Sequence, residues 1–267
     1  MLDKELLAEI VGLSFGDGSL TLHKHSNVLR YQLRGDARED RQYYENFIIP
    51  TFTKITMELI GRRVSTVLDK KLNSFGVAVH SNKFGSFLSN LGVVIGRKKE
   101  LSIPKWITKD RAFLKAFIRG FFDTDGSVTF RRNYTAKDKS PRIIRFQMSS
   151  TSKVLAIELS KILVDLGFRP YSHSFMPKPG TMLGHRITIE KRSDIPKWIS
   201  EIGFDNPKHQ TKYLVWKKFG VCPPRTTILD RQRILNGNLD PLHTPLMRGW
   251  KSGQIRYLED KVKRVVP

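Results

Sequence analysis

The chain has 267 residues, 39% of them hydrophobic, so it is long enough for one large domain or two smaller ones with real cores. Its 47 lysines and arginines exceed its 25 acidic residues, and the net charge of +22 is spread along the chain, which predicts nucleic acid as the partner. The single cysteine, Cys222, excludes an intrachain disulfide and a cysteine-rich zinc site. With no long apolar run and no signal peptide, we expect an intracellular protein, cytoplasmic in a prokaryote, with no membrane partner.

The first half of the chain predicts a helix, two hairpins and covering helices. The helix begins at an Asp3 cap and runs to about Gly16, where the sequence reads Asp-Gly-Ser. The hydrophobic period then changes from about 3.6 to about 2, which predicts a hairpin with one apolar face and one basic, hydrogen-bonding face. We expect next a helix within 36–60 that is broken at Pro50, a hairpin over 64–80 and a short helix over 84–91.

The second half repeats this order from a helix that Asp110 caps. A hairpin over 127–149, a helix over 152–166, a hairpin over 168–190 and a short helix over 195–202 follow. The sequences LSNLGV, from Leu88, and ISEIGF, from Ile199, occupy the same place in each half. The sequence therefore predicts an α+β tandem duplication with repeats at 1–109 and 110–220 and a C-terminal extension at 221–267. We expect pseudo-twofold symmetry and two saddle-shaped antiparallel sheets joined by the two helices that end in Asp-Gly-Ser.

Those two helices carry small residues four apart on one face, which would let them approach closely. The small residues are Gly12 and Gly16 in the first helix and Gly120 and Thr124 in the second. If the helices pack through these faces, Asp17 and Asp125 lie side by side at their ends. Each carboxylate is repelled by a helix C-terminus and by the other carboxylate, and a divalent cation such as Mg²⁺ would relieve both effects. We interpret Asp123 as a solvated or terminal-turn residue that faces elsewhere.

The two helices resemble the LAGLIDADG motifs of the homing endonucleases. The nine-letter motif falls on Ile10–Gly18 and Ile118–Gly126, with Asp17 and Asp125 at the catalytic acids. The first copy departs from the pattern in its middle, at Ser14 and Phe15. The resemblance ends after Gly220, and it implies a monomer with two motifs. Because the chain lacks the terminal residues of an intein, it resembles the free-standing, intron-encoded members.

The resemblance implies metal-dependent hydrolysis of both strands of a long, imperfectly palindromic DNA site, with a short 3′ stagger. Mg²⁺ is the expected cofactor and Mn²⁺ its substitute, and the metal site consists of Asp17, Asp125, Gly16 and Thr124. The family also places one basic residue of each repeat beside the metal. By position after Gly92 and Gly203, these are Lys98, with Lys99 as a competitor, and Lys208. Gly35 and Ser150 stand where the family often has a polar residue that orders water.

The polar faces of the two first hairpins predict contacts with DNA bases, because two-stranded ribbons fit the major groove and Arg and Gln can bind guanine and adenine there. The contact residues that we predict are Ser19, Thr21, His23, Arg30, Gln32 and Arg34 in the first repeat, and Ser127, Thr129, Arg131, Arg145, Gln147 and Ser149 in the second. Since the two sets differ, we expect the two half-sites to differ.

Three alternatives stay open at this point. A protein of this fold can act as a maturase on its intron RNA, or as a DNA-binding regulator that no longer cleaves. A general polyanion-binding protein would account for the charge but not for the duplicated Asp-Gly-Ser motifs. The extension, with a helix over 226–235 and Arg225, Arg231 and Arg233, is either an additional DNA-contacting element or a strap over the core.

Overall fold

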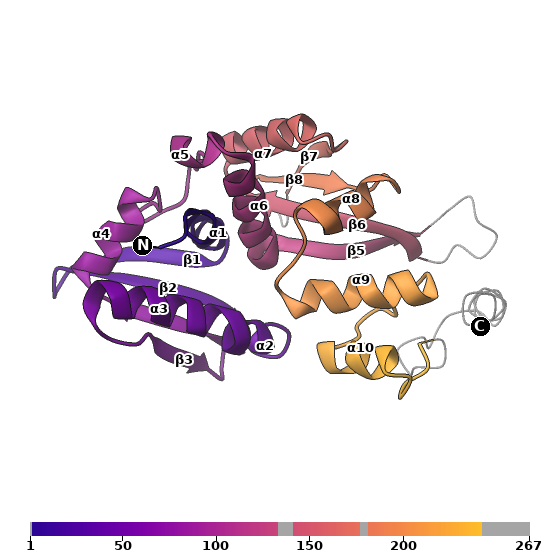
Figure 1. Ribbon diagram of the computed structural model, residues 1–267, viewed down its shortest axis with the longest axis horizontal. Coiled ribbons are helices and arrows are strands. Elements are labelled where there is room, and N and C mark those ends of the chain that lie inside the picture. The colour runs from indigo at the N-terminus through magenta and orange to yellow at the C-terminus, as the bar shows by residue number, and fades with distance from the viewer. Residues whose placement is uncertain (1, 133–140, 177–180, 242–267) are drawn as a thin grey trace.

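The computed structural model describes residues 2–132, 141–176 and 181–241. Two units, each a four-stranded antiparallel sheet with covering helices, meet along a central helix pair (Figure 1). The pair is α1 (Lys4–Phe15) and α6 (Arg111–Asp125). This confirms the predicted α+β tandem duplication.

The helices α1 and α6 touch at the level of their backbones. A Cβ atom on Gly12 would lie 2.1 Å from the Phe117 carbonyl oxygen, and one on Gly120 would lie 2.3 Å from the Glu9 carbonyl oxygen. No side chain fits at such separations, so both positions require glycine for the close approach. Asp3 and Asp110 cap the two helices, as predicted, by accepting hydrogen bonds from the backbone N–H of Glu5 and Ala112.

The first unit has the strand order β1-β2-β4-β3, with apolar side chains turned toward its helices. The strands are β1 (Gly18–His23), β2 (Val28–Asp36), β3 (Ser65–Asp69) and β4 (Ser74–His80), and the helices are α2 (Arg41–Tyr43), η1 (Tyr44–Ile48), α3 (Ile49–Ile60) and α4 (Asn82–Asn90). Asn27 and Asn73 have positive φ at the two hairpin turns, a conformation that asparagine tolerates better than most residues.

The second unit repeats the arrangement with the order β5-β6-β8-β7. Its strands are β5 (Gly126–Arg132), β6 (Pro141–Ser150), β7 (Tyr171–Phe175) and β8 (Gly184–Ile189), and its helices are α7 (Lys153–Asp165) and α8 (Asp194–Glu201), with the short α5 (Lys105–Thr108) before α6. The apolar face of the sheet, including Ile144, Phe146 and Met148, is buried. The predicted apolar face is largely buried in both units, but Leu22 on that face is exposed and Gln147 on the predicted polar face is buried.

Two local predictions were wrong or incomplete. Pro50 does not break the helix, because the chain is helical from Arg41 to Ile60 and Pro50 stands in the first turn of α3, just after the π-helical turn η1. Helix α9 (Pro207–Phe219) was not predicted, since most of its apolar residues stand in one run, 213–216, which makes no clear apolar stripe along the helix. Asn206 caps α9 and Pro207 occupies its first position.

The C-terminal part of the described chain packs against α9. Helix α10 (Ile228–Leu235) begins with a capping box made by Thr227 and Asp230. Val215, Cys222 and Ile234 form a small buried cluster between the two helices. In Figure 1 this pair of helices lies below the second sheet, on the side where α2 of the first unit ends. Within the residues that the structure describes, no helix is long and apolar enough to cross a membrane.

Candidate catalytic site between the two motif helices

Asp17 and Asp125 meet where α1 and α6 end. A Cβ atom on Gly16 would lie 1.9 Å from the Thr124 hydroxyl oxygen and 3.4 Å from the backbone nitrogen of Asp125. The two C-terminal ends are therefore in contact, and each sends one acidic residue to the same place. Both Asp17 and Asp125 are exposed to solvent, so a cation or a phosphate can reach them.

The surroundings of the two acids make both carboxyl groups harder to ionise. Loss of hydration among the crowded atoms around Asp125, and then the Asp17 charge, raise its pKa to about 7. Loss of hydration and then the charge of Asp40 raise the pKa of Asp17. The two residues are exposed, and yet their carboxyl groups are close enough for the charge of Asp17 to disfavour ionisation of Asp125. Two neighbouring carboxylates at an exposed position form a donor set that fits a hard divalent cation.

Lys98 lies on one side of the acid pair. Its ammonium donates hydrogen bonds to the carbonyl oxygens of Phe15, at 3.1 Å, and Gly16. Burial lowers the pKa of Lys98, while Asp125 and Asp17 act in the opposite direction. Lys98, Asp125 and Ser149 line a cavity of about 350 Å³.

These contacts bear on two predicted residues. The Gly16 carbonyl, expected as a metal ligand, already accepts a hydrogen bond from Lys98, so at most one lone pair remains for a metal. The Thr124 hydroxyl donates to the carbonyl oxygens of Gly120 and Phe121. Lys99, the alternative to Lys98, is exposed. The structure thus favours Lys98 as the lysine of the first repeat.

Lys208 lies beside the same acid pair on α9. Its charge lowers the pKa of both Asp17 and Asp125, as does that of Lys98. Unlike Lys98, it forms an ion pair, with 2.7 Å between its Nζ and Oδ1 of Asp40. It lines a second cavity, of about 460 Å³. Both predicted lysines are therefore brought to the acid pair, in different surroundings.

Asp40 is a residue of the site that the sequence analysis missed. Its buried carboxylate accepts hydrogen bonds from the Asn206 side chain, at 2.8 Å, and from the Asp36 N–H, at 2.9 Å, besides its ion pair with Lys208. A Cβ atom on Gly35 would lie 2.8 Å from Oδ2 of Asp40, so this carboxylate fills the space that a side chain at position 35 would take. The sequence signal was an acidic residue before a helix, which is also the pattern of an ordinary cap, yet Asp40 makes no capping hydrogen bond with its side chain.

Asp123 lies in the terminal turn of α6, as one of the two interpretations had it, but it is buried rather than solvated. Its Oδ2 accepts a hydrogen bond from the Asp205 N–H at 2.8 Å, and burial raises its pKa well above the usual range. Glu9, Asp123 and Asp205 are close enough to hold a metal ion. However, the Arg119 guanidinium lies 2.6 Å from Glu9 and 2.9 Å from Asp205, so a cation already occupies this group.

The predicted DNA-contacting face of the first sheet is open. Ser19, Thr21 and His23 on β1 are exposed. On β2 the Gln32 amide lies between Arg30 and Arg34, and with its oxygen turned toward them it accepts from Nη2 of Arg34 at 2.8 Å. The cations and the amide of this face are half-buried and lie side by side.

The matching face of the second sheet is more internally paired. The buried Gln147 side chain accepts a hydrogen bond from Thr129 at 2.8 Å and donates one to Thr188 at 3.2 Å. Arg131 forms an ion pair with Glu190, and the Ser149 hydroxyl accepts from Nε of Arg186. The remaining predicted contacts, Ser127 and Arg145, are half-buried.

Comparison with known proteins identifies part of the chain by sequence. Residues 112–203, which hold α6 and the second sheet, match the LAGLIDADG-like domain family. Among curated proteins, the replication factor C small subunit of Methanocaldococcus jannaschii is 25% identical over 210 residues, which is 79% of this chain and 10% of that protein. The tRNA-splicing ligase RtcB of the same organism is 24% identical over 227 residues, 75% of this chain and 22% of that protein. The chain thus spans only a small part of these relatives.

Solved structures match this chain over nearly their whole length. The homing endonuclease I-DmoI in complex with DNA and Mn has a TM-score of 0.53 at 18% identity, over 75% of this chain and 97% of that one. The meganuclease I-SmaMI bound to uncleavable DNA has a TM-score of 0.52 at 12% identity, over 97% of this chain and 98% of that one. At these identities the likeness establishes the fold. The chain therefore has the fold of these homing endonucleases, and its residues 112–203 match the LAGLIDADG-like domain family.

Proposed function

We propose that the protein is a metal-dependent homing endonuclease that hydrolyses both strands of a long duplex DNA site. The single observation that carries the proposal is the meeting of Asp17 and Asp125 at the ends of two helices, with Lys98 and Lys208 beside them. One site between two sheets suits a duplex, because each sheet can contact one half of the target while the strands pass the acids at the centre.

Asp17 and Asp125 would hold Mg²⁺, or Mn²⁺ in its place. The cation, when bound, supplies charge neutralisation at the scissile phosphates and activation of water. Lys98 and Lys208 donate hydrogen bonds to phosphate oxygens and stabilise the negative charge that develops there. With a pKa of about 7, Asp125 also can hold or release a proton near neutral pH.

Recognition of the target rests on the two sheets. The net charge of +22 gives strong, salt-dependent attraction to the phosphate backbone. On the first sheet Arg30, Gln32 and Arg34, which lie side by side, would contact bases in the major groove. On the second sheet Gln147 is hydrogen-bonded to Thr129 and Thr188, and Arg131 is paired with Glu190. Either these contacts break when DNA binds, or the two residues position other side chains. The two halves of the target are then read unequally, by a monomer that carries both motifs.

Cleavage of a randomised duplex library by the purified protein, with Mg²⁺ and with EDTA, tests this function when the new ends are sequenced. We expect metal-dependent ends with a common 3′ stagger inside one long motif. Salt-sensitive binding without cleavage would overturn the proposal and favour a DNA-binding regulator. Binding that prefers structured RNA over duplex DNA, again without cleavage, would favour a maturase.

A further inference from the structure

The C-terminal segment 221–241, which contains α10, is attached to chain neighbours of both partners of the Asp40–Lys208 ion pair. The attachment runs through Arg231, whose side chain is fully buried. Its Nη2 lies 2.6 Å from Oε2 of Glu39, and its Nε donates a hydrogen bond of 2.9 Å to the Thr211 hydroxyl. A third hydrogen bond goes to the Thr226 carbonyl oxygen.

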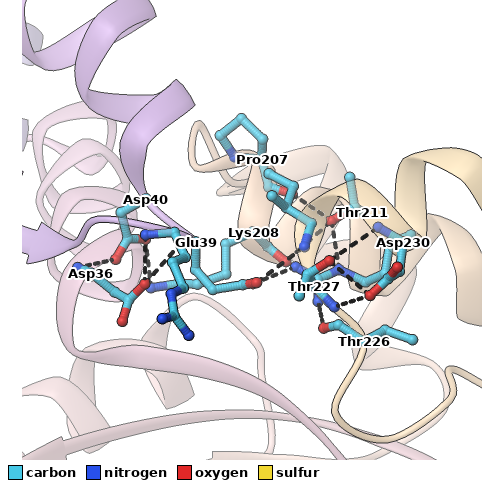
Figure 2. Close-up of polar contacts among 12 residues, drawn as sticks. Asp36, Glu39, Asp40, Pro207, Lys208, Thr211, Thr226, Thr227 and Asp230 are labelled. Atoms are coloured by element: carbon cyan, nitrogen blue, oxygen red, sulfur yellow. Dashed lines mark hydrogen bonds and ion pairs between the residues drawn. The ribbon is translucent and has the colours of Figure 1, made fainter. Parts of the chain in front are cut away.

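The two ends of this attachment are direct neighbours of the ion pair. Glu39 precedes Asp40 in the chain, and Thr211 lies three residues after Lys208, on the adjacent turn of α9. Arg231 therefore bridges the segment that carries the carboxylate and the helix that carries the lysine. Figure 2 shows the Asp36–Asp40 loop and the first turn of α9 facing each other, with the start of α10 beside them.

Further contacts hold α10 to the same segment of the first unit. Glu39 also accepts a hydrogen bond from the Ile228 N–H, at 3.0 Å, and the Gln232 amide donates to the Gln42 amide oxygen at 3.0 Å. On the other side of the segment, Asn206 caps α9 and donates to Asp40. Residues 39–42 are thus held between two helices from the C-terminal part of the chain.

This arrangement makes Arg231 sensitive to the loss of its partner. A fully buried guanidinium needs its carboxylate, since a buried charge left unpaired is strongly unfavourable. Arg231 and Glu39 therefore keep a fixed separation between the first unit and α9. Lys98, by contrast, is fixed by carbonyl oxygens of α1, and its loop is attached to α7 through Ser152 and Glu158.

We propose that the segment 221–241 positions Lys208, and that Arg231, acting through Glu39 and Asp40, sets the rate of cleavage of one of the two DNA strands. The inference rests on the proposed function, because it assigns Lys208 to one scissile phosphate and Lys98 to the other. Arg231 touches neither DNA nor the acids in this account. It is a positioning residue for Lys208.

Strand-resolved cleavage tests this inference. A target duplex with a different label on each strand is cut by excess protein, and the rate of each strand is measured for Arg231→Met, Glu39→Gln and the double variant. We expect each to slow one strand relative to the other by about threefold or more, up to the effect of Lys208→Met itself, because a small misplacement of a catalytic group is costly. The slowed strand is the one that Lys208→Met also slows, and DNA affinity stays within about twofold.

A matched control comes from an ion pair elsewhere in the second unit. Glu201 pairs with Lys115 at 2.8 Å, and Glu201→Gln should leave the ratio of the two strand rates unchanged. Equal slowing of both strands by the Arg231 and Glu39 variants, or no slowing, would overturn the inference. If Arg231→Met does not fold, the double variant decides, since it leaves neither partner of the buried ion pair with an unpaired charge. Failure of the wild-type protein to cut at all would instead overturn the proposed function.

Discussion

Lys98 and Lys208 stand beside the same pair of acids, but the protein holds them by different means. Lys98 donates to the neutral carbonyl oxygens of Phe15 and Gly16, so its positive charge stays available to a phosphate. Lys208 is paired with Asp40, so part of its charge is already balanced. A duplicated site can thus keep one lysine on each side while a neighbouring carboxylate offsets the charge of only one of them.

The cause of the difference lies where each unit reaches across to the other. After the first unit, the Leu101 N–H donates to the hydroxyl of Ser152, the neutral cap of α7. After the second unit, Asn206 and Lys208 reach the charged Asp40 before α2. The segment 221–241 adds the Arg231–Glu39 pair on this side. These contacts from one unit to the other, more than the two sheets, make the surroundings of the two lysines differ.

The largest effect on cleavage that we expect comes from Asp17 and Asp125, because both DNA strands are cut at this one acid pair. Asp17→Asn or Asp125→Asn should lower the cleavage rate of both strands by at least about a hundredfold, because each removes a charge that the cation needs. DNA binding, measured at fixed salt, should change little, since it depends on phosphate and groove contacts. Full cleavage by either variant would show that the two acids do not form one site.

Substitution of each lysine should slow the cleavage of a different DNA strand. Lys98→Met should slow one strand by about tenfold or more, and Lys208→Met should slow the other strand by less, because Asp40 already offsets the Lys208 charge. Single-turnover rates on a duplex labelled on each strand measure both effects. Equal losses on both strands from either variant would contradict the assignment of one lysine to each strand.

The pH dependence of metal binding should follow Asp125. A metal competes with a proton for this carboxylate, whose pKa is about 7, so affinity for Mn²⁺ should fall about tenfold between pH 8 and pH 6. Titration calorimetry at several pH values measures this fall. Asp125→Asn should remove the pH dependence along with most of the affinity, whereas a flat profile in the wild-type protein would contradict the raised pKa.

The smallest effect concerns stability without metal. Because the folded pKa of Asp125 is raised, its contribution to stability is present below the unfolded pKa and is lost as pH rises through about 7. Asp125→Asn should therefore raise the melting temperature at pH 8 in EDTA and have less effect at pH 5. We expect the free energy of unfolding to change by no more than about 1 kcal/mol, since solvent screens this exposed group. A variant less stable at pH 8 than the wild-type protein would contradict this sign.

Much of the fold was predictable because its signals are local. The glycines at positions 12 and 120, the Asp-Gly-Ser ends and the alternating hairpins each specify a feature within a few residues, and the structure confirms the paired helices and both sheets. The position of the lysines beside the acids followed from the repeat. Their catalytic roles, like those of the DNA-contacting residues, stay predictions.

What could not be predicted depends on contacts between distant segments. Asp40 looks like an ordinary cap until Lys208 and Asn206 arrive from the other unit. Asp123 looks solvated until the Asp205 backbone covers it. Arg231 reads as one of several basic residues in a basic chain, and its burial against Glu39 becomes visible only in the fold.

The most direct test of the central claim is to locate the metal. The anomalous scattering of Mn²⁺ in a crystal of the protein with its target DNA would show which carboxylates bind it. We predict a peak within coordination distance of both Asp17 and Asp125. A peak among Glu9, Asp123 and Asp205, with Arg119 displaced, or no peak at the ends of α1 and α6, would contradict the account.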